Sequence, residues 1–595
     1  MFKYLNVQIQ GDDFALFSNR FKNYNAEIFK KDLLSGVIVG VIAIPLGMAF
    51  AIASGVKPEY GIYTTIIAGI LASLFGGSSF QISGPTGAFI PLLFGIVATY
   101  GYEGLLVSGF MAGIMLILMG IFKLGALIKF IPRPVTIGFT TGIAVTIFAG
   151  QISKFLGLDG VASKEYFHET IHEIITHFHT IDIYSIITAI ICLVIILITP
   201  KIAPKVPGAI IGIIISTVFA LIFFPGKVAT IGSAYGEIPS ALPSFSFFNI
   251  SLTDMAHLLR PAFTIAMLCA IESLLSAVVA DGMTNTRHNS NKELIGQGIA
   301  NMVTPLFGGI PATGAIARTA TNIKTGAQTR VAGIIHGIVV LLTLLILAPY
   351  ASNIPLASMA PVLMVVAWNM SERKEFVHVL KTKTGDSLVL LLTFLLTVFV
   401  NLTVAVEVGL LLAVILFVKR MSEVFRVNNV LPDFNDEKGK VLPSAVSQSH
   451  FCPQISMFDV EGSLFFGAAE TFVYYVLDSI NYQPKVVLLK MNKLIHLDTT
   501  GENNLRNIVV QLEKSGSQIL ISGLKDQPLE MIKRTGLYDK IGEEYFFNDT
   551  QAAINYAINK ISKETCRGCD HFAFKECENL SHMKNPLAPN KGEVK

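Results

Sequence analysis

The chain has 595 residues, of which 52% are hydrophobic and only 15% are charged, and its mean hydropathy is +0.59. This composition excludes an ordinary soluble protein and places the chain among membrane proteins. The formal net charge of +3 is nearly balanced and comes without a basic stripe interleaved with aromatic residues, so nucleic acid is not a predicted partner.

The first part of the chain, residues 1–32, carries scattered charges. It lacks the basic, then apolar, then small-residue pattern of a cleaved secretory signal. We therefore expect a cytosolic N-terminal segment that is kept in the mature protein.

Residues 33–420 contain a succession of apolar runs that predicts a transmembrane transport domain. A spanning helix needs about 20 largely apolar residues, because the hydrocarbon core is about 30 Å thick and each helical residue rises about 1.5 Å. The runs suit roughly fourteen spans. Basic clusters at Lys30–Lys31 and Lys419–Arg420 favour cytosolic ends. An even number of spans then gives a multi-pass protein of the cell (cytoplasmic) membrane with both termini in the cytosol.

This domain contains an internal repeat, with halves at about 33–226 and 261–420. Two motifs occur in each half: Leu-Phe-Gly-Gly at 74–77 and 306–309, and Thr-Gly-Ala at Thr86, Gly87, Ala88 and again at Thr313, Gly314, Ala315. The two threonines lie 227 residues apart, and the first apolar runs of the halves begin 228 residues apart, at Leu33 and Pro261. Two similar offsets predict one duplicated unit.

A proline accompanies each triplet, Pro85 in the first half and Pro311 in the second, so a Gly/Pro-rich break interrupts both halves. Paired breaks of this kind point to a transporter binding site. A half-helix that begins after a break presents free N–H groups and the positive end of its dipole, which suits an anion. We expect substrate between the two triplets, with the threonine hydroxyls as further donors. The alternative is that these glycines and prolines serve close helix packing.

Glu272 and Ser276 lie four residues apart within an apolar run, on one helical face. An intramembrane carboxylate is costly and suggests function, and a carboxylate with a hydroxyl can hold sodium or form a proton site. Glu272 and Ser276 are therefore predicted to bind the coupling ion. Arg318, one turn after the second triplet, could supply positive charge to the anion. Alternatively, Arg318 is a structural counter-ion that neutralises Glu272.

The composition changes after residue 420. Residues 421–450 are predicted to be a linker, and 451–563 alternate strands with helices, which indicates a soluble α/β domain. The tail, 564–595, contains Cys566, Cys569, His571 and Cys577, whose Cys-x-x-Cys spacing and ligand types suit zinc. The alternative is a tail of reduced thiols.

In its motifs the sequence resembles the sulfate permease (SulP) family of anion transporters. The strings that carry the resemblance are 40–51 (GVIAIPLGMAFA), 60–64 (YGIYT), 82–88 (ISGPTGA), 272–277 (ESLLSA) and 310–318 (IPATGAIAR). The resemblance implies two inverted repeats of seven segments, a fold shared with uracil permease-type carriers. It also implies a core part that moves against a gate part, and a homodimer.

The C-terminal domain looks like the STAS domain usual in that family. Its loop at 496–501 resembles the phosphorylation loop of stand-alone STAS proteins, which would make Thr499 and Thr500 regulatory and a cytosolic regulator a possible partner. The implied function is secondary active transport of a small anion coupled to sodium or a proton, and not an enzymatic activity.

Two departures from the sulfate-type pattern bear on the substrate. Many sulfate-type members have Gln and Tyr where this chain has Leu46 and Phe50, and the apolar pair is similar to that of dicarboxylate-type members. Sulfate, bicarbonate and C4-dicarboxylates all stay open. The alternative functions are a nucleobase permease of the same fold and a membrane-anchored anion sensor that signals through the STAS domain.

Overall fold

The computed structural model describes residues 24–581 except for short gaps at 127–130, 163, 165, 204–206, 249–251, 433–440, 443–445, 447–449 and 479–482. Most of the predicted N-terminal segment, part of the predicted linker and the end of the tail therefore lie outside the described residues. The chain divides into two compact units, Met1–Ala413 and Val414–Lys595. We call them the membrane unit and the soluble unit.

The membrane unit is helical apart from two very short strands. Its α-helices are α1 (Ala26–Ala53), α2 (Pro58–Phe75), α3 (Ile90–Ile121), α4 (Arg133–Leu156), α5 (Phe167–Thr176), α6 (Ile183–Ile202), α7 (Gly208–Phe223), α8 (Ile231–Tyr235), α9 (Leu252–Thr284), α10 (Ser290–Val303), α11 (Ile316–Lys324), α12 (Val331–Ala351), α13 (Leu356–Met370), α14 (Arg373–Lys381), α15 (Gly385–Phe399) and α16 (Leu402–Val424), the last of which continues into the soluble unit. The short strands are β1 (Ser83–Gly84) and β2 (Thr313–Gly314), and 3-10 turns occur at Gly87–Phe89 (η2), Phe178–Thr180 (η4) and Thr304–Phe307 (η5).

Seven of the described helices are long and apolar enough to cross a membrane, and α7 and α15 are shorter apolar helices. Helix α3 is kinked at Gly101, whose φ of 71° and ψ of −178° are not helical, so it comprises two segments. With α3 counted as two, the first half contains seven segments, namely α1, α2, both parts of α3, α4, α6 and α7. The second half contains α9, α10, α11, α12, α13, α15 and α16.

The helix contacts reveal a twofold relation between the halves. α1 packs on α12 while its counterpart α9 packs on α3, and α4 packs on α15 while α13 packs on α6. Each contact recurs with the halves exchanged, which is the pattern that a twofold axis produces. Because each repeat has an odd number of segments, the second begins on the opposite side of the membrane. The predicted inverted repeat is confirmed.

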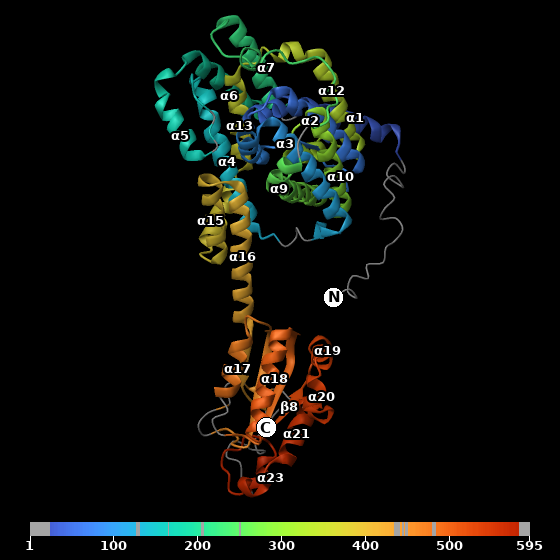
Figure 1. Cartoon of the computed structure of the whole chain (residues 1–595), viewed down its shortest axis with the longest axis vertical. Helices are drawn as coiled ribbons and strands as arrows, with labels where there is room; N and C mark the ends of the chain where they lie inside the picture. Colours follow the sequence, from blue (N-terminus) through green and yellow to red (C-terminus); the bar gives the residue numbers. More distant parts are fainter. Residues whose placement is uncertain are drawn as a thin grey trace, which may run out of the picture. The chain divides into compact units, whose positions relative to one another are not determined.

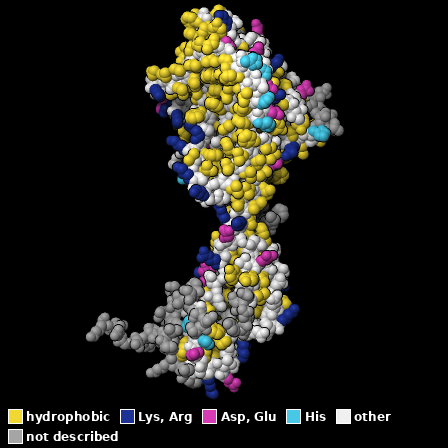
Figure 2. All heavy atoms as spheres, turned by 90° about the vertical axis from the view of Figure 1, so that its left-hand side faces the viewer, with side chains coloured by type: hydrophobic (Ala, Val, Ile, Leu, Met, Phe, Trp, Pro, Cys, Tyr) yellow, Lys and Arg dark blue, Asp and Glu magenta, His cyan; other side chains and the backbone are white. Residues whose placement is uncertain are grey.

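The helices of the membrane unit gather in two groups (Figure 1). One group contains α1, α2, α3, α9, α10, α11 and α12, and the other contains α4 to α7, α13 and α15. Hydrophobic side chains cover much of the face of this unit that Figure 2 shows. Exposed apolar residues of the unit include Leu197 of α6 and Ile222 of α7. This surface suits contact with lipid chains.

The soluble unit is a sheet covered by helices. Its strands are β3 (Arg426–Asn429), β4 (Leu431–Pro432), β5 (Val441–Leu442), β6 (Ile455–Leu464), β7 (Val486–Leu497), β8 (Gln518–Ser522) and β9 (Phe546–Phe547). Its helices are α17 (Ala469–Asp478), α18 (Thr499–Lys514), α19 (Asp526–Arg534), α20 (Leu537–Ile541), the turn η6 (Glu543–Tyr545), α21 (Thr550–Lys560), α22 (Lys563–Cys566) and α23 (Cys577–Ser581).

The main sheet has the strand order β3-β6-β7-β8-β9, and only the edge strand β3 is antiparallel to its neighbour. Successive residues of β7 point to opposite faces, so Val487 packs with α17 to α20 while Leu488 packs with α21 and the tail. Helices thus cover both faces, and the predicted α/β domain is confirmed. Residues 426–429, within the predicted linker, form β3.

Candidate anion site at the paired helix breaks

The two predicted breaks lie against each other and form a two-stranded ribbon inside the membrane unit. Strands β1 and β2 are antiparallel, with Ser83 opposite Gly314 and Gly84 opposite Thr313. Each strand is followed at once by a helix, η2 and α3 after the first and α11 after the second. Because the strands are antiparallel, the chain leaves the ribbon in opposite directions, and the two half-helices begin at opposite ends of it.

Helix α10 braces both strands of the ribbon with polar side chains. Gln297 Nε2 donates to Ser83 Oγ at 2.7 Å in the first break. Asn301 holds the second break through both amide atoms: Nδ2 donates to the Ala312 carbonyl at 2.8 Å, and Oδ1 accepts from the Ala312 N–H at 2.8 Å. Asn301 thus satisfies both backbone groups of Ala312. These hydrogen bonds stabilise the second break, because the ladder between β1 and β2 contains only two residue pairs.

Glu293, on the same helix, accepts hydrogen bonds from the N–H groups of Gly77 at 2.8 Å and Ser78 at 2.9 Å. Our sequence analysis did not select Glu293, Gln297 or Asn301. Their spacing of four residues places them on one helical face, and three polar residues on one face of a buried helix is the signal that could have identified them.

Two glycines allow close contact at the ribbon. A Cβ on Gly314 would lie 1.7 Å from Gln81 Nε2, and a Cβ on Gly84 would lie 2.6 Å from Arg318 Nη1. A larger residue at either position would therefore displace the buried Gln81 or Arg318 side chain.

Thr86 and Glu272, both predicted site residues, are in direct contact. The Thr86 hydroxyl donates to Glu272 Oε2 at 3.0 Å, and Thr86 is buried. This bond joins the first break to the carboxylate of α9 across 186 residues of sequence. The predicted anion site and the predicted cation site therefore share a hydrogen bond.

The other two predicted hydroxyls are used within the protein. Thr313 Oγ1 donates to the Cys269 carbonyl at 3.2 Å, and Ser276 Oγ donates to Thr319 Oγ1 at 3.2 Å. Thr319 Oγ1 also accepts from the Ile82 N–H at 3.1 Å. Ser276 is thus linked through Thr319 to α11 and to the first break.

Arg318 reaches from α11 to the first break. Its Nη2 donates to the Pro85 carbonyl, and the side chain is buried. Among the residues that the structure describes, Arg318 and Glu272 form no ion pair within 4.0 Å. The guanidinium therefore adds positive charge to the ribbon without being paired directly with the carboxylate.

The half-helices themselves also favour an anion. Neither η2 nor α11 has a side-chain cap at its N-terminus. The first N–H groups of a helix lack partners within the helix, and each N-terminus carries roughly half a positive charge. Arg318 and the two helix ends therefore bring positive charge to the side of the ribbon where Glu272 contacts Thr86, while Glu293 accepts the Gly77 and Ser78 N–H groups. A cation or proton on Glu272 would raise the local charge by one further unit, so the arrangement can couple anion binding to cation binding.

Apolar side chains cover the first half-helix at Gly87. A Cβ there would lie 2.9 Å from Met370 Sδ, 3.4 Å from Ile147 Cδ1 and 3.6 Å from Phe50 Cε1. Phe50, the position that departs from the sulfate-type pattern, therefore faces the break. Leu46, the other departing position, packs against a cluster that includes Ile213.

In the soluble unit, the loop before α18 places the two predicted regulatory threonines at a helix start. Asp498 is the N-cap and accepts from the Gly501 N–H at 2.7 Å, while Thr499 and Thr500 are exposed in the first turn. The threonines do not cap the helix. A phosphate on either would lie at the positive end of the helix dipole, where it is favoured.

The tail folds back on the sheet and meets a fifth residue that our sequence analysis did not include. Cys566, Cys569, His571 and Cys577 line a small cavity together with Cys452, which precedes β6. Burial, followed by the nearby thiols, raises the pKa of Cys577 to about 11. In the conformation described, no three His, Cys, Asp or Glu side chains of the described residues are placed to hold a metal ion.

The sequence matches two family models. Residues 29–393 match the model of the sulfate permease family, and residues 448–553 match that of the STAS domain. Bacillus subtilis (strain 168) YvdB, whose name proposes sulfate transport, is 54% identical over 89% of this chain and 98% of its own length. The bicarbonate transporter BicA of Picosynechococcus sp. is 28% identical over 90% of this chain and 95% of its own.

Two solved structures have a similar fold. The inward-facing structure of the murine Solute Carrier 26 family member A9 anion transporter matches with a TM-score of 0.82 and 18% identity, over 90% of this chain and 92% of that chain. The transmembrane domain of a cyanobacterial bicarbonate transporter BicA matches with a TM-score of 0.58 and 30% identity, over 66% of this chain and 98% of that chain.

Proposed function

Because the chain belongs to the sulfate permease family, we propose that it is a secondary active transporter of a small anion, with sulfate, bicarbonate and C4-dicarboxylates as the candidate substrates. The relatives named for sulfate and for bicarbonate support the first two candidates. The apolar Phe50 at the first break favours an anion that does not need a tyrosine hydroxyl there. The protein acts in the cell membrane as a homodimer with both termini in the cytosol, and a cytosolic regulator acts through the STAS domain.

The hydrogen bond between Thr86 and Glu272 carries the mechanism. The anion binds at the two half-helix N-termini, near Thr86, Gly87 and Ala88 on one side and Thr313, Gly314 and Ala315 on the other, with Arg318 as an added charge. Glu272 takes up the proton or sodium ion. Moving one negative charge inward against about 100 mV costs about 2.3 kcal/mol, and a cation on Glu272 cancels that term.

Uptake into proteoliposomes tests the proposal. We expect the purified protein to accumulate at least one of labelled sulfate, bicarbonate, succinate and fumarate when a proton or sodium gradient is imposed, and unlabelled substrate to compete. A proton-coupled protein needs the pH gradient, whereas a sodium-coupled one works after the pH gradient is collapsed. Binding of an anion without uptake would instead support a membrane-anchored sensor, and uptake of labelled uracil alone would support a nucleobase permease.

A further inference from the structure

The membrane unit contains a cavity of about 390 Å³ between the two helix groups. Ile52, Ile90 and Phe94 of α1 and α3 line one wall, and Thr146, Gly150 and Lys154 of α4 line the other. The cavity ends near the anion site, because Ile90 directly follows η2 and the adjoining Ile147 covers Gly87. It is thus an approach to the paired breaks.

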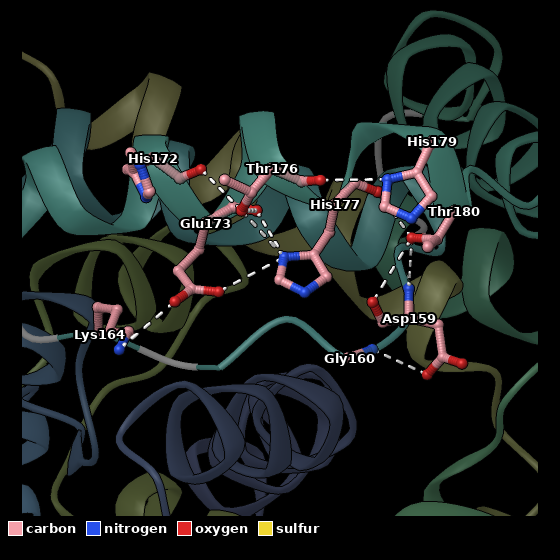
Figure 3. Close-up of polar contacts among 9 residues, drawn as sticks. All are labelled: Asp159, Gly160, Lys164, His172, Glu173, Thr176, His177, His179 and Thr180. Carbon is pink, nitrogen blue, oxygen red and sulfur yellow. Dashed lines mark hydrogen bonds and ion pairs between the residues drawn. The ribbon is translucent and has the colours of Figure 1, made fainter.

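Two of the three lysines that line this cavity are held by neighbours. Lys164 Nζ lies 3.4 Å from Glu173 Oε1 on α5, as Figure 3 shows. Lys227 Nζ donates to the Tyr184 hydroxyl at 3.1 Å and lies 4.4 Å from the centre of that ring. Neither lysine is fully available to a ligand in the cavity.

The two aspartates of the cavity are also engaged. Asp182 caps α6, where its carboxylate accepts from the Tyr184 and Ser185 N–H groups and from the Ser185 hydroxyl. Asp159 is exposed and accepts from the Gly160 N–H at 2.9 Å (Figure 3). Lys154 Nζ forms no hydrogen bond or ion pair with either aspartate.

Lys154 differs from the other charged residues of the cavity. It is half-buried, and its Nζ has neither a hydrogen bond nor an ion pair among the residues that the structure describes. It lies seven residues after Ile147 on α4, which is two turns along one face, or about 10 Å. The cavity that Lys154 lines therefore extends along α4 to Ile147, the residue that covers Gly87.

We propose that Lys154 forms a second anion-binding position, in the approach cavity, which attracts a small oxyanion or carboxylate and passes it to the paired breaks. The movement of the anion from Lys154 to the paired breaks rests on the proposed transport function. A cation in a concave, partly apolar cavity concentrates anions, and the effect weakens with ionic strength. The competing explanation is that Lys154, in the last turn of α4, only stabilises the helix dipole.

Three full-length variants in proteoliposomes distinguish these explanations: Lys154→Gln, Lys154→Arg and the control Lys57→Gln. Lys57 is an exposed lysine at the N-cap of α2 that does not line the cavity. We expect Lys154→Gln to raise the KM of the accumulated anion severalfold at low salt, because the cavity loses the cation that concentrates anions there. The maximal rate should change little, and Lys154→Arg should retain the parent KM.

The ionic-strength dependence sharpens the test, since KM should rise with salt in the parent and much less in Lys154→Gln. Sulfate-induced and bicarbonate-induced thermal stabilisation, measured on the same variants in detergent, reports binding without transport. It separates failure of this inference from failure of the transport function. A parent-like KM and parent-like stabilisation in Lys154→Gln, an equal change in Lys57→Gln, or a lowered Tm as the sole effect would overturn the proposal.

Discussion

At the scale of single residues, the contact between Thr86 and Glu272 means that the anion and cation positions cannot be altered independently. Thr86→Val keeps the shape of the side chain but removes its donor. We expect weaker anion binding by about 1 kcal/mol or more, because the hydrogen bond that links the first break to the Glu272 carboxylate is lost. Equilibrium binding of labelled anion to the purified protein measures this change.

Thr313→Val is the matched control in the second break, because the Thr313 hydroxyl donates to the Cys269 backbone carbonyl and not to Glu272. Its main expected effect is a lower Tm. Equal loss of affinity in both variants would show that the Thr313 hydroxyl turns to the anion, and unchanged affinity in both would move the site away from the breaks.

Glu272→Gln keeps the size of the side chain and removes its charge. It should abolish gradient-driven accumulation while leaving passive anion exchange possible, because a cation no longer accompanies the anion. Glu407→Gln is the control, since Glu407 is half-exposed and lies 3.7 Å from Arg260. Accumulation and exchange are compared in the same vesicles.

Parent-like accumulation by Glu272→Gln would make the carboxylate structural. The double variant with Thr86→Val adds a second check. Because the two side chains are in contact, the combined effect should differ from the sum of the single effects.

At the scale of elements, the ribbon of β1 and β2 depends on the absence of a side chain at Gly314. Gly314→Ala would place a methyl group 1.7 Å from Gln81 Nε2 and 3.1 Å from Ser273 Cα of α9, which forces the buried Gln81 side chain or the ribbon to shift. We expect destabilisation of about 1–3 kcal/mol and loss of uptake. Gly282→Ala in α9 is the control, because its added methyl group meets nothing within 4 Å. Equal Tm and uptake in both variants would contradict the proposed packing at the ribbon.

Zinc binding by the tail can involve a fifth residue, because Cys452 lines the same cavity as the four predicted ligands. If the tail binds zinc, the thiol side chains must turn toward the cavity, since the described conformation holds no metal-binding group of three. We expect metal analysis of the purified full-length protein to give about one zinc ion per chain and to show its loss in Cys569→Ser and Cys452→Ser. Cys192→Ser in α6 is the control, and His571→Ala tests the remaining ligand. Equal zinc in all variants would exclude the site.

At the scale of the whole molecule, the soluble unit should regulate transport without forming the permeation path. Strand β3 pairs with β6, so a truncation at Phe451 would remove the partner of an edge strand and leave β3 behind. Deletion of residues 425–595 removes the sheet completely. We expect a changed rate or assembly and an unchanged order of anion preference in competition assays. A changed order would place part of the selectivity in the soluble unit.

The sequence by itself determined the membrane class, the repeat of two halves, the two breaks and the α/β character of the C-terminal domain. These features depend on local properties: the length of apolar runs, the position of glycine and proline, and the alternation of strand and helix patterns. The same local information identified Thr86, Thr313, Glu272 and Arg318 as candidates, because polar groups within apolar runs are costly.

Only the tertiary structure decided which of these groups meet. It paired the breaks as β1 and β2, joined Thr86 to Glu272, turned Ser276 toward Thr319 and added Cys452 to the tail. These contacts link segments between 43 and 231 residues apart in the chain. The physical reason is that side-chain contacts over such separations are set by how helices pack against one another, and a local pattern contains no information about the partner surface.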